Sequence, residues 1–162
     1  MANIYLGLGS NEFPKKNLAL ALKQLEIRFG CLNKSTIYRG AAVGFDGDDF
    51  LNLVVAIQSE KSPIEICQEI ESIHDLIGRV RDNCKWGPRP IDIDLLLYAD
   101  LIIDERPVRV PREDILKFSF VLRPIAEIAP NLIHPLTGNT LLEHWVSFDQ
   151  KKHLLESVDI DF

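Results

Sequence analysis

The 162-residue chain has few cysteines, no long apolar run and no excess of basic residues. Cys31, Cys67 and Cys84 are odd in number and contain no Cys-x-x-Cys pair, which argues against a disulfide framework and against a zinc site. No apolar stretch approaches the roughly 20 residues that a membrane-spanning helix needs, and no basic region followed by an apolar one opens the chain. These absences predict a cytoplasmic protein that is neither exported nor embedded in a membrane.

Acidic residues outnumber basic ones: the chain has 24 aspartates and glutamates and 18 lysines and arginines, for a net charge of −6. A chain of this charge repels nucleic acid and anionic membrane as a whole, so we expect neither as a partner. The 46% hydrophobic and 26% charged residues are typical of a globular protein. The length suits one compact domain over residues 1–162, and we expect a monomer with small-molecule substrates.

Apolar periodicity predicts an alternation of strands and helices in the first hundred residues. The expected elements are strands at 4–8, 35–39, 50–57 and 91–98 and helices at 15–29 and 63–77. Ser62, Pro63 and Glu65 form a capping box at the start of the second helix. The order β-α-β-β-α-β predicts an α+β fold with a ferredoxin-like core, in which two helices cover one sheet face and the other is left free for ligands.

The last sixty residues are predicted to form a C-terminal strand and helix extension. Short apolar runs at Val108–Pro111 and Phe120–Pro124 indicate further strand and loop structure, and a helix is expected near Thr140 to Val146. The acidic tail from Leu154 to Phe162 carries no pattern that predicts its structure.

Two neighbouring patterns carry most of the chemistry. Four cationic residues precede a strand in which Asp92 and Asp94 alternate with isoleucines, so both carboxylates share one face; the cations are Arg79, Arg81, Lys85 and Arg89. Guanidinium groups bind phosphate oxygens at two points, and paired carboxylates suit magnesium, which also takes phosphate and water ligands. A nucleoside triphosphate with a divalent metal would satisfy both patterns.

Each pattern alone has an ordinary explanation. A bare Asp-x-Asp is typical of the solvated face of an edge strand, and a cationic run is typical of a solvated loop. Trp86 is a costly aromatic to leave on an exposed loop, and Gly87-Pro88 fixes a bend beside it. Loop and acids together therefore favour the site for metal and triphosphate.

The run Lys85–Leu97, with the Arg-x-Arg before it, closely resembles the signature of the 6-hydroxymethyl-7,8-dihydropterin pyrophosphokinase family. Further matches lie at Leu6–Asn11, Phe50–Asn52 and Pro124–Pro130, so the resemblance covers nearly the whole chain. It implies transfer of the β,γ-diphosphate of the co-substrate ATP to the hydroxymethyl group of the pterin, which leaves AMP, in folate biosynthesis.

The resemblance also implies a role for individual residues. Arg79, Arg89, Asp92 and Asp94 would be catalytic, and the two aspartates would hold two Mg²⁺ ions. ATP would be bound by Glu71, Arg79, Arg81, Lys85, Trp86, Arg89, Arg109 and Arg112. The pterin would be bound by Gly40, Val43, Phe50, Asn52 and Phe120, with the two phenylalanines on either side of the ring and Asn52 on its polar edge.

Four residues depart from the family pattern. Gly40-Ala41 replaces a Thr-Pro pair, Arg112 replaces a histidine and could keep its phosphate contact, and His74 occupies a helix position that we expect to be acidic. We predict that His74 is a plain helix-surface residue.

Two other functions fit parts of the pattern. A nucleotidyl transferase or cyclase of the palm type also carries metal-binding acids on a ferredoxin-like sheet, but this acidic chain offers no nucleic-acid track. A non-catalytic module could keep the pocket without turnover. Formation of AMP from ATP, magnesium and the pterin distinguishes the alternatives.

Overall fold

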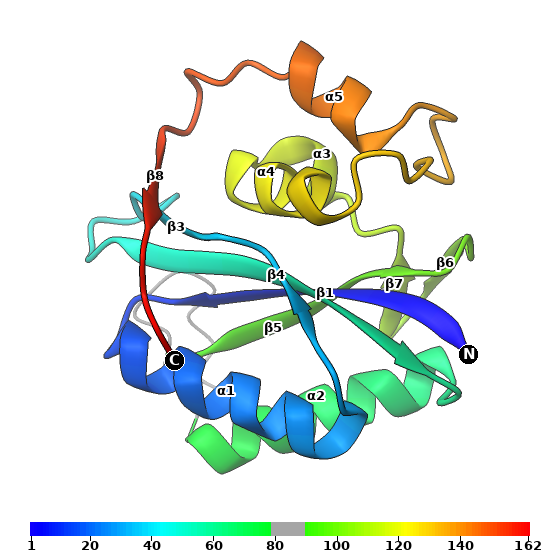
Figure 1. The fold of residues 1–162 in the computed structure, drawn as a ribbon, viewed down its shortest axis with the longest axis horizontal. Helices are drawn as coiled ribbons and strands as arrows, with labels where there is room; N and C mark the ends of the chain where they lie inside the picture. Colours follow the sequence, from blue (N-terminus) through cyan, green and yellow to red (C-terminus); the bar gives the residue numbers. More distant parts are fainter. Residues whose placement is uncertain (79–89) are drawn as a thin grey trace.

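The computed structural model describes residues 1–78 and 90–162, and its fold is shown in Figure 1. Its elements in chain order are β1 (Ala2–Ser10), α1 (Pro14–Phe29), β2 (Asn33–Lys34), β3 (Ile37–Gly40), β4 (Phe50–Ser59), α2 (Pro63–Ile77), β5 (Asp92–Tyr98), β6 (Ile103–Glu105), β7 (Val108–Val110), α3 (Asp114–Lys117), α4 (Ser119–Ile128), α5 (Leu141–Ser147) and β8 (Leu155–Val158).

One antiparallel sheet organises the molecule. Its strands lie in the order β5-β1-β4-β3-β8, with β2 also paired to β4, so β1 has β5 on one side and β4 on the other. The predicted α+β fold with a ferredoxin-like βαββαβ core is confirmed. The acidic tail, for which the sequence predicted no structure, contributes the edge strand β8. The short strands β6 and β7 form a separate hairpin.

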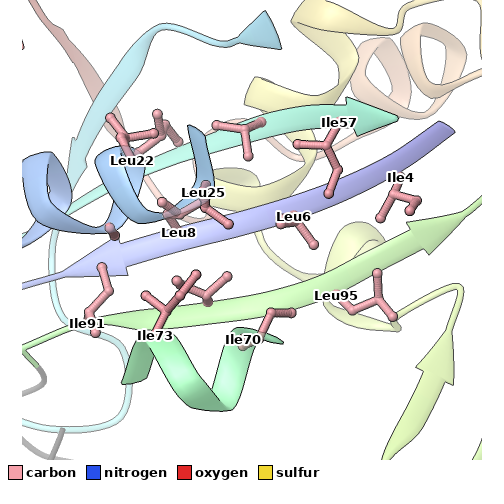
Figure 2. Packing of buried hydrophobic residues seen from close by; sticks show 14 of the residues in the cluster. Ile4, Leu6, Leu8, Leu22, Leu25, Ile57, Ile70, Ile73, Ile91 and Leu95 are labelled. Carbon is pink, nitrogen blue, oxygen red and sulfur yellow. The ribbon is translucent and has the colours of Figure 1, made fainter. Parts of the chain in front are cut away.

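The main hydrophobic core lies between the sheet and the helices α1 and α2, which cover the same face (Figure 1). Alternate residues of β1 point into this core because successive side chains of a strand face opposite sides. Figure 2 shows Leu6 and Leu8 of β1 close to Leu25 of α1 and Ile73 of α2. These four side chains are at most 2% exposed.

The second helix, α2, begins as the sequence predicts. Ser62 Oγ accepts a hydrogen bond from Glu65 N at 3.3 Å, and Ser62 N donates to Glu65 Oε2 at 2.7 Å, which completes the capping box. Its apolar stripe faces the sheet. Within residues 1–78 and 90–162, no helix is long and apolar enough to cross a membrane.

The opposite face of the sheet is not left free, contrary to the sequence prediction. Helices α3, α4 and α5 lie over it, as Figure 1 shows, and a second apolar cluster joins Val54 of β4 and Leu96 of β5 to Leu122 and Ile125 of α4. The helices cover part of this face because the extension must bury its own apolar stripe. The uncovered part borders a cavity.

The prediction of strand and loop at Phe120–Pro124 was wrong, because these residues lie in α4. A short apolar run does not distinguish a buried strand from a buried helix, and Pro124 inside the run argued against a helix. Burial of Val121, Leu122 and Ile125 at helical spacing against the sheet outweighs the missing N–H of the proline. The other two predictions for the C-terminal extension are confirmed, because β7 and α5 lie where a strand and a helix were expected.

A buried histidine stabilises the connection between α4 and α5. His134 is 2% exposed, and its Nδ1 accepts a hydrogen bond from the backbone N–H of Leu136 at 3.2 Å. Burial lowers the pKa of His134, and the nearby ring of His144 lowers it further. The neutral ring is therefore the form that fits the fold.

We predict that the free energy of unfolding decreases as the pH falls below about 6.5, the ordinary histidine value, because the unfolded chain then binds a proton that folded His134 resists. Above that pH this contribution is fully present. Denaturant titrations at pH 7.5 and 5.5 should show a smaller loss in His134→Asn, whose amide can accept the same hydrogen bond without titrating. An equal loss in both proteins would contradict the prediction.

Candidate active site

A cavity of about 610 Å³ opens on the sheet face opposite α1 and α2, next to α3 and α4. Strand register decides which side chains face it, because residues directly opposite each other in an antiparallel pair point to the same side. Gly9 of β1 lies between Asn52 of β4 and Asp92 of β5. Gly7 lies between Val54 and Asp94 in the same way. The acids and the amide therefore face one cavity from two strands.

The two glycines form a floor without side chains between these strands. A Cβ atom built on Gly9 would lie 2.7 Å from Oδ1 of Asn52, which is closer than such atoms approach in proteins. At Gly7 a Cβ would lie 3.2 Å from Cδ1 of Leu96. Glycine at both positions leaves room for side chains of the neighbouring strands, and such close approach is a recognised reason for glycine inside a strand.

The paired aspartates lie at the end of the cavity formed by β5, and both are half-buried. Arg112 places its Nη2 3.5 Å from Oδ1 of Asp94 and its Nε 3.3 Å from Oδ2 of Asp114. Partial burial alone would lower the pKa of Arg112, but Asp94 and Asp114 outweigh it and raise that pKa above its ordinary value. The Arg112 guanidinium therefore stays charged beside the acids and can form hydrogen bonds to a phosphate group.

The donor set fits magnesium better than a transition metal. Residues 1–78 and 90–162 contain no group of three or more His, Cys, Asp or Glu side chains arranged to hold a metal ion. Asp92 and Asp94 supply two carboxylates from one strand face. Magnesium accepts one or two carboxylates when phosphate oxygens and water complete its coordination. The pair would hold Mg²⁺ only together with a phosphorylated ligand.

His74 is not a surface residue, so its sequence prediction was wrong. Its side chain is 2% exposed, and Nε2 accepts a hydrogen bond at 2.9 Å from the backbone N–H of Ile93, which lies between the two aspartates. Since a backbone N–H only donates, Nε2 carries no proton and Nδ1 must carry it. Nδ1 then donates to Oε1 of Glu71 at 3.1 Å. Helix spacing alone could not reveal this contact with a strand 19 residues away.

Aromatic side chains line the other end of the cavity. Phe50 comes from β4, with Phe45 edge-on to it at 6.2 Å between ring centroids. Phe120 comes from α4 and stacks on Phe118 at 5.0 Å with an interplanar angle of 16°. Asn52, which is 8% exposed, adds a polar group to the same lining. Such a combination suits a flat heterocycle with a polar edge.

The structure brings most of the described predicted residues together. The cavity is lined by Val43, Phe50, Asn52, Asp92, Asp94, Arg109, Arg112 and Phe120. Its described lining does not include Gly40, which ends β3 and packs against Leu155, or Glu71, which contacts His74. The predictions for Arg79, Arg81, Lys85, Trp86 and Arg89 lie outside the described residues.

Sequence reasoning missed several lining residues, among them Gly7, Gly9, Lys117 and Phe118. A signal existed for the glycines, because two of them at alternate positions of a buried strand indicate close approach. No comparable signal marks Lys117 or Phe118, since both depend on how α3 and α4 pack over the sheet.

Paired acids, an arginine and an aromatic pocket on a ferredoxin-like sheet are features expected of an enzyme that transfers phosphoryl groups. Residues 5–130 match the family described as 7,8-dihydro-6-hydroxymethylpterin-pyrophosphokinase (HPPK). Among curated proteins, the 2-amino-4-hydroxy-6-hydroxymethyldihydropteridine pyrophosphokinase of Aquifex aeolicus is 39% identical over 145 residues, which is 88% of this chain and 90% of the relative. That of Methylorubrum extorquens is 39% identical, over 92% of this chain and 95% of the relative. The chain belongs to the HPPK family and is a diphosphotransferase enzyme.

Solved structures agree in fold. A Plasmodium falciparum HPPK-DHPS wild type with STZ-DHP superposes with a TM-score of 0.75 at 14% identity, and a second HPPK-DHPS structure, in complex with substrates, gives 0.76 at 14%. Each comparison covers 93% of this chain but 44% of the solved chain, so this chain spans less than half their length. At this identity the likeness concerns the fold alone.

We predict that Gly9→Ala weakens pterin binding roughly tenfold, because the new methyl group displaces the Asn52 amide and costs about one hydrogen bond. The free energy of unfolding should change little, since a side-chain end can move aside. Calorimetry with 6-hydroxymethyl-7,8-dihydropterin measures the affinity. In an Asn52→Ala background the same substitution should have little further effect, and full additivity would contradict the displacement.

For His74 we predict that His74→Leu lowers the free energy of unfolding by about 1–3 kcal/mol, because the buried N–H of Ile93 loses its acceptor. It should also raise the Mg²⁺ concentration needed for half-maximal turnover, since the strand segment carrying both aspartates loses its support. His74→Gln retains an acceptor and should lie closer to the wild type in both measurements. If leucine and glutamine behaved alike, the hydrogen bond would not be the cause.

Proposed function

We propose that this enzyme transfers the β,γ-diphosphate of ATP to the hydroxymethyl oxygen of 6-hydroxymethyl-7,8-dihydropterin, with AMP as the second product, in folate biosynthesis. One observation carries the proposal beyond family membership. The register of β1 with β4 and β5 places Asn52 and the aspartates Asp92 and Asp94 on one cavity, separated by glycines. An acceptor bound near Asn52 would therefore present its alcohol towards the acids.

The aromatic end of the cavity is the proposed pterin site. Phe50 and Phe120 come from opposite sides of it, one from the sheet and one from α4, so they could contact the two faces of a flat ring. The Asn52 amide offers one acceptor and two donors to the polar edge of the heterocycle. Directional hydrogen bonds then fix the ring's orientation, and stacking supplies buried apolar area.

The acidic end of the cavity is the proposed site of the triphosphate. Arg112 lies beside Asp94, and Arg109 and Lys117 line the same cavity. A second cavity of about 540 Å³ shares Arg109 and Arg112 and extends beside β6 and β7. This shared lining gives room for the rest of a nucleotide. The cations at Arg79, Arg81, Lys85 and Arg89 and the aromatic Trp86 lie outside the described residues, and their phosphate-binding role stays a prediction from the resemblance.

Two Mg²⁺ ions held by Asp92 and Asp94 complete the proposal; when bound, they would neutralise phosphate charge and lower the pKa of the attacking alcohol. The pterin oxygen forms a bond to the β-phosphorus, and the bond from that phosphorus to the oxygen bridging it to the α-phosphate breaks. The leaving electron pair stays on AMP, and the alcohol releases its proton. The protein contributes mainly position and charge, as is usual for phosphoryl transfer.

We expect Asp94→Asn to reduce AMP formation at least a hundredfold, because charge stabilisation by a bound metal is worth several kcal/mol in the transition state. The assay follows AMP from ATP, Mg²⁺ and the pterin at saturating substrate. Asp100→Asn is the matched control: Asp100 lies in the exposed turn after β5, outside the cavity, and its substitution should leave turnover unchanged.

Turnover by Asp94→Asn at the wild-type rate would remove the aspartate from the metal site. Binding of both substrates by the wild type without any AMP would instead favour the non-catalytic alternative. Circular dichroism and denaturant titration of each variant show whether a loss of activity reflects unfolding.

A further inference from the structure

Phe118 and Phe120, at the start of helix α4, form what we call the aromatic wall of the cavity. Helix α4 is attached to the sheet near its C-terminal end. Glu127 accepts hydrogen bonds from the hydroxyl of Tyr38 at 2.6 Å and from the backbone N–H of Thr36 at 2.8 Å. The guanidinium of Arg123 lies over the Tyr38 ring at 4.6 Å. These contacts fix α4 against β3 but lie one to two turns beyond Phe120.

A second attachment holds the N-terminal end of α4, and the C-terminal segment supplies it. Ser119 is fully buried, and its Oγ donates a hydrogen bond at 2.6 Å to the carbonyl oxygen of His153. The His153 ring lies 5.7 Å from the ring of Phe118 and 6.3 Å from that of Phe120, between centroids. His153 thus packs against both stacked phenylalanines, although it is not among the described residues that line the cavity.

The same segment continues directly into β8, the edge strand beside β3 (Figure 1). Leu155 pairs with Gly40, and its Cδ2 lies 3.0 Å from where a Cβ of residue 40 would be. A larger side chain at position 40 would displace this leucine. Gly40 therefore makes room for β8 immediately before Ala41 and Val43, which line the cavity.

We propose that residues 153–158, which we name the terminal brace, position the pterin pocket by joining its aromatic wall on α4 to the end of β3. The inference rests on the proposed function, since it assumes that the pterin binds at this wall. The brace contains no predicted ligand-binding residue itself and acts through Phe118, Phe120 and Gly40. It also lies beyond residues 5–130, the part that matches the family.

Ring packing is what position 153 contributes. Nδ1 of His153 is buried and finds no hydrogen-bond partner among residues 1–78 and 90–162. A buried polar atom without a partner is unfavourable, so hydrogen bonding does not explain a histidine ring held here. A phenylalanine of similar shape should keep the contact with the aromatic wall, whereas alanine should lose it.

If Phe118 and Phe120 are held in place before the pterin binds, binding does not include the entropy cost of ordering these two side chains. In the full-length protein we expect His153→Ala and Ser119→Ala to weaken pterin binding roughly three- to tenfold, as for one or two immobilised side chains. His153→Phe should bind as the wild type does. Ser157→Ala removes only an exposed hydroxyl from β8 and keeps the backbone pairing with Tyr38, so this matched control should also bind normally.

Calorimetry should compare the pterin, titrated in the presence of Mg²⁺ and a non-hydrolysable ATP analogue, with the ATP analogue titrated alone. The expected result is weaker pterin binding with ATP-analogue affinity unchanged. Equal loss of both affinities would mean general destabilisation and would overturn the proposal, as would unaltered pterin binding in Ser119→Ala. Should His153→Ala not fold, Ser119→Ala and His153→Phe still decide the outcome. A wild type that binds no pterin would overturn the proposed function, and the brace with it.

Discussion

The central strand β1 is the constraint on which the rest of the molecule depends, because it hydrogen-bonds to β4 on one side and to β5 on the other. Leu6 and Leu8 point from it into the core beneath α1 and α2. Gly7 and Gly9 occupy the positions on the other face and form the floor of the cavity. One strand therefore supplies both the packing that stabilises the fold and the open surface that forms the site.

The two glycines keep the floor of the cavity open but make strand β1 itself less stable. A glycine inside a strand costs about 0.5–1 kcal/mol relative to alanine, and two of them lie in β1. Burial of the β1 side chains that face α1 and α2 offsets that cost. Strand β1 is also held by a hydrogen-bonded strand on each side. Beneath the same floor, His74 satisfies the backbone N–H between the two aspartates, so the charged end of the cavity is supported from within the core.

Much of the fold followed from sequence periodicity, and particular residues show where such reasoning stops. The capping box at Ser62 and the shared face of Asp92 and Asp94 are local patterns, set within a few residues, and both were predictable. His74 was misplaced because its partner lies on another element. Phe120 was assigned to strand or loop because a short apolar run acquires its helical form only by packing on the sheet.

The sequence by itself determined the βαββαβ order of the first hundred residues, the pairing of the acids and, through a long motif, the family. Only the tertiary structure decided that Gly9 lies between Asn52 and Asp92, and that His153, shortly before the last strand, packs against Phe118 and Phe120. The physical reason is that contacts between residues far apart in the sequence depend on how strands align and how helices pack over them. Local propensity sets neither.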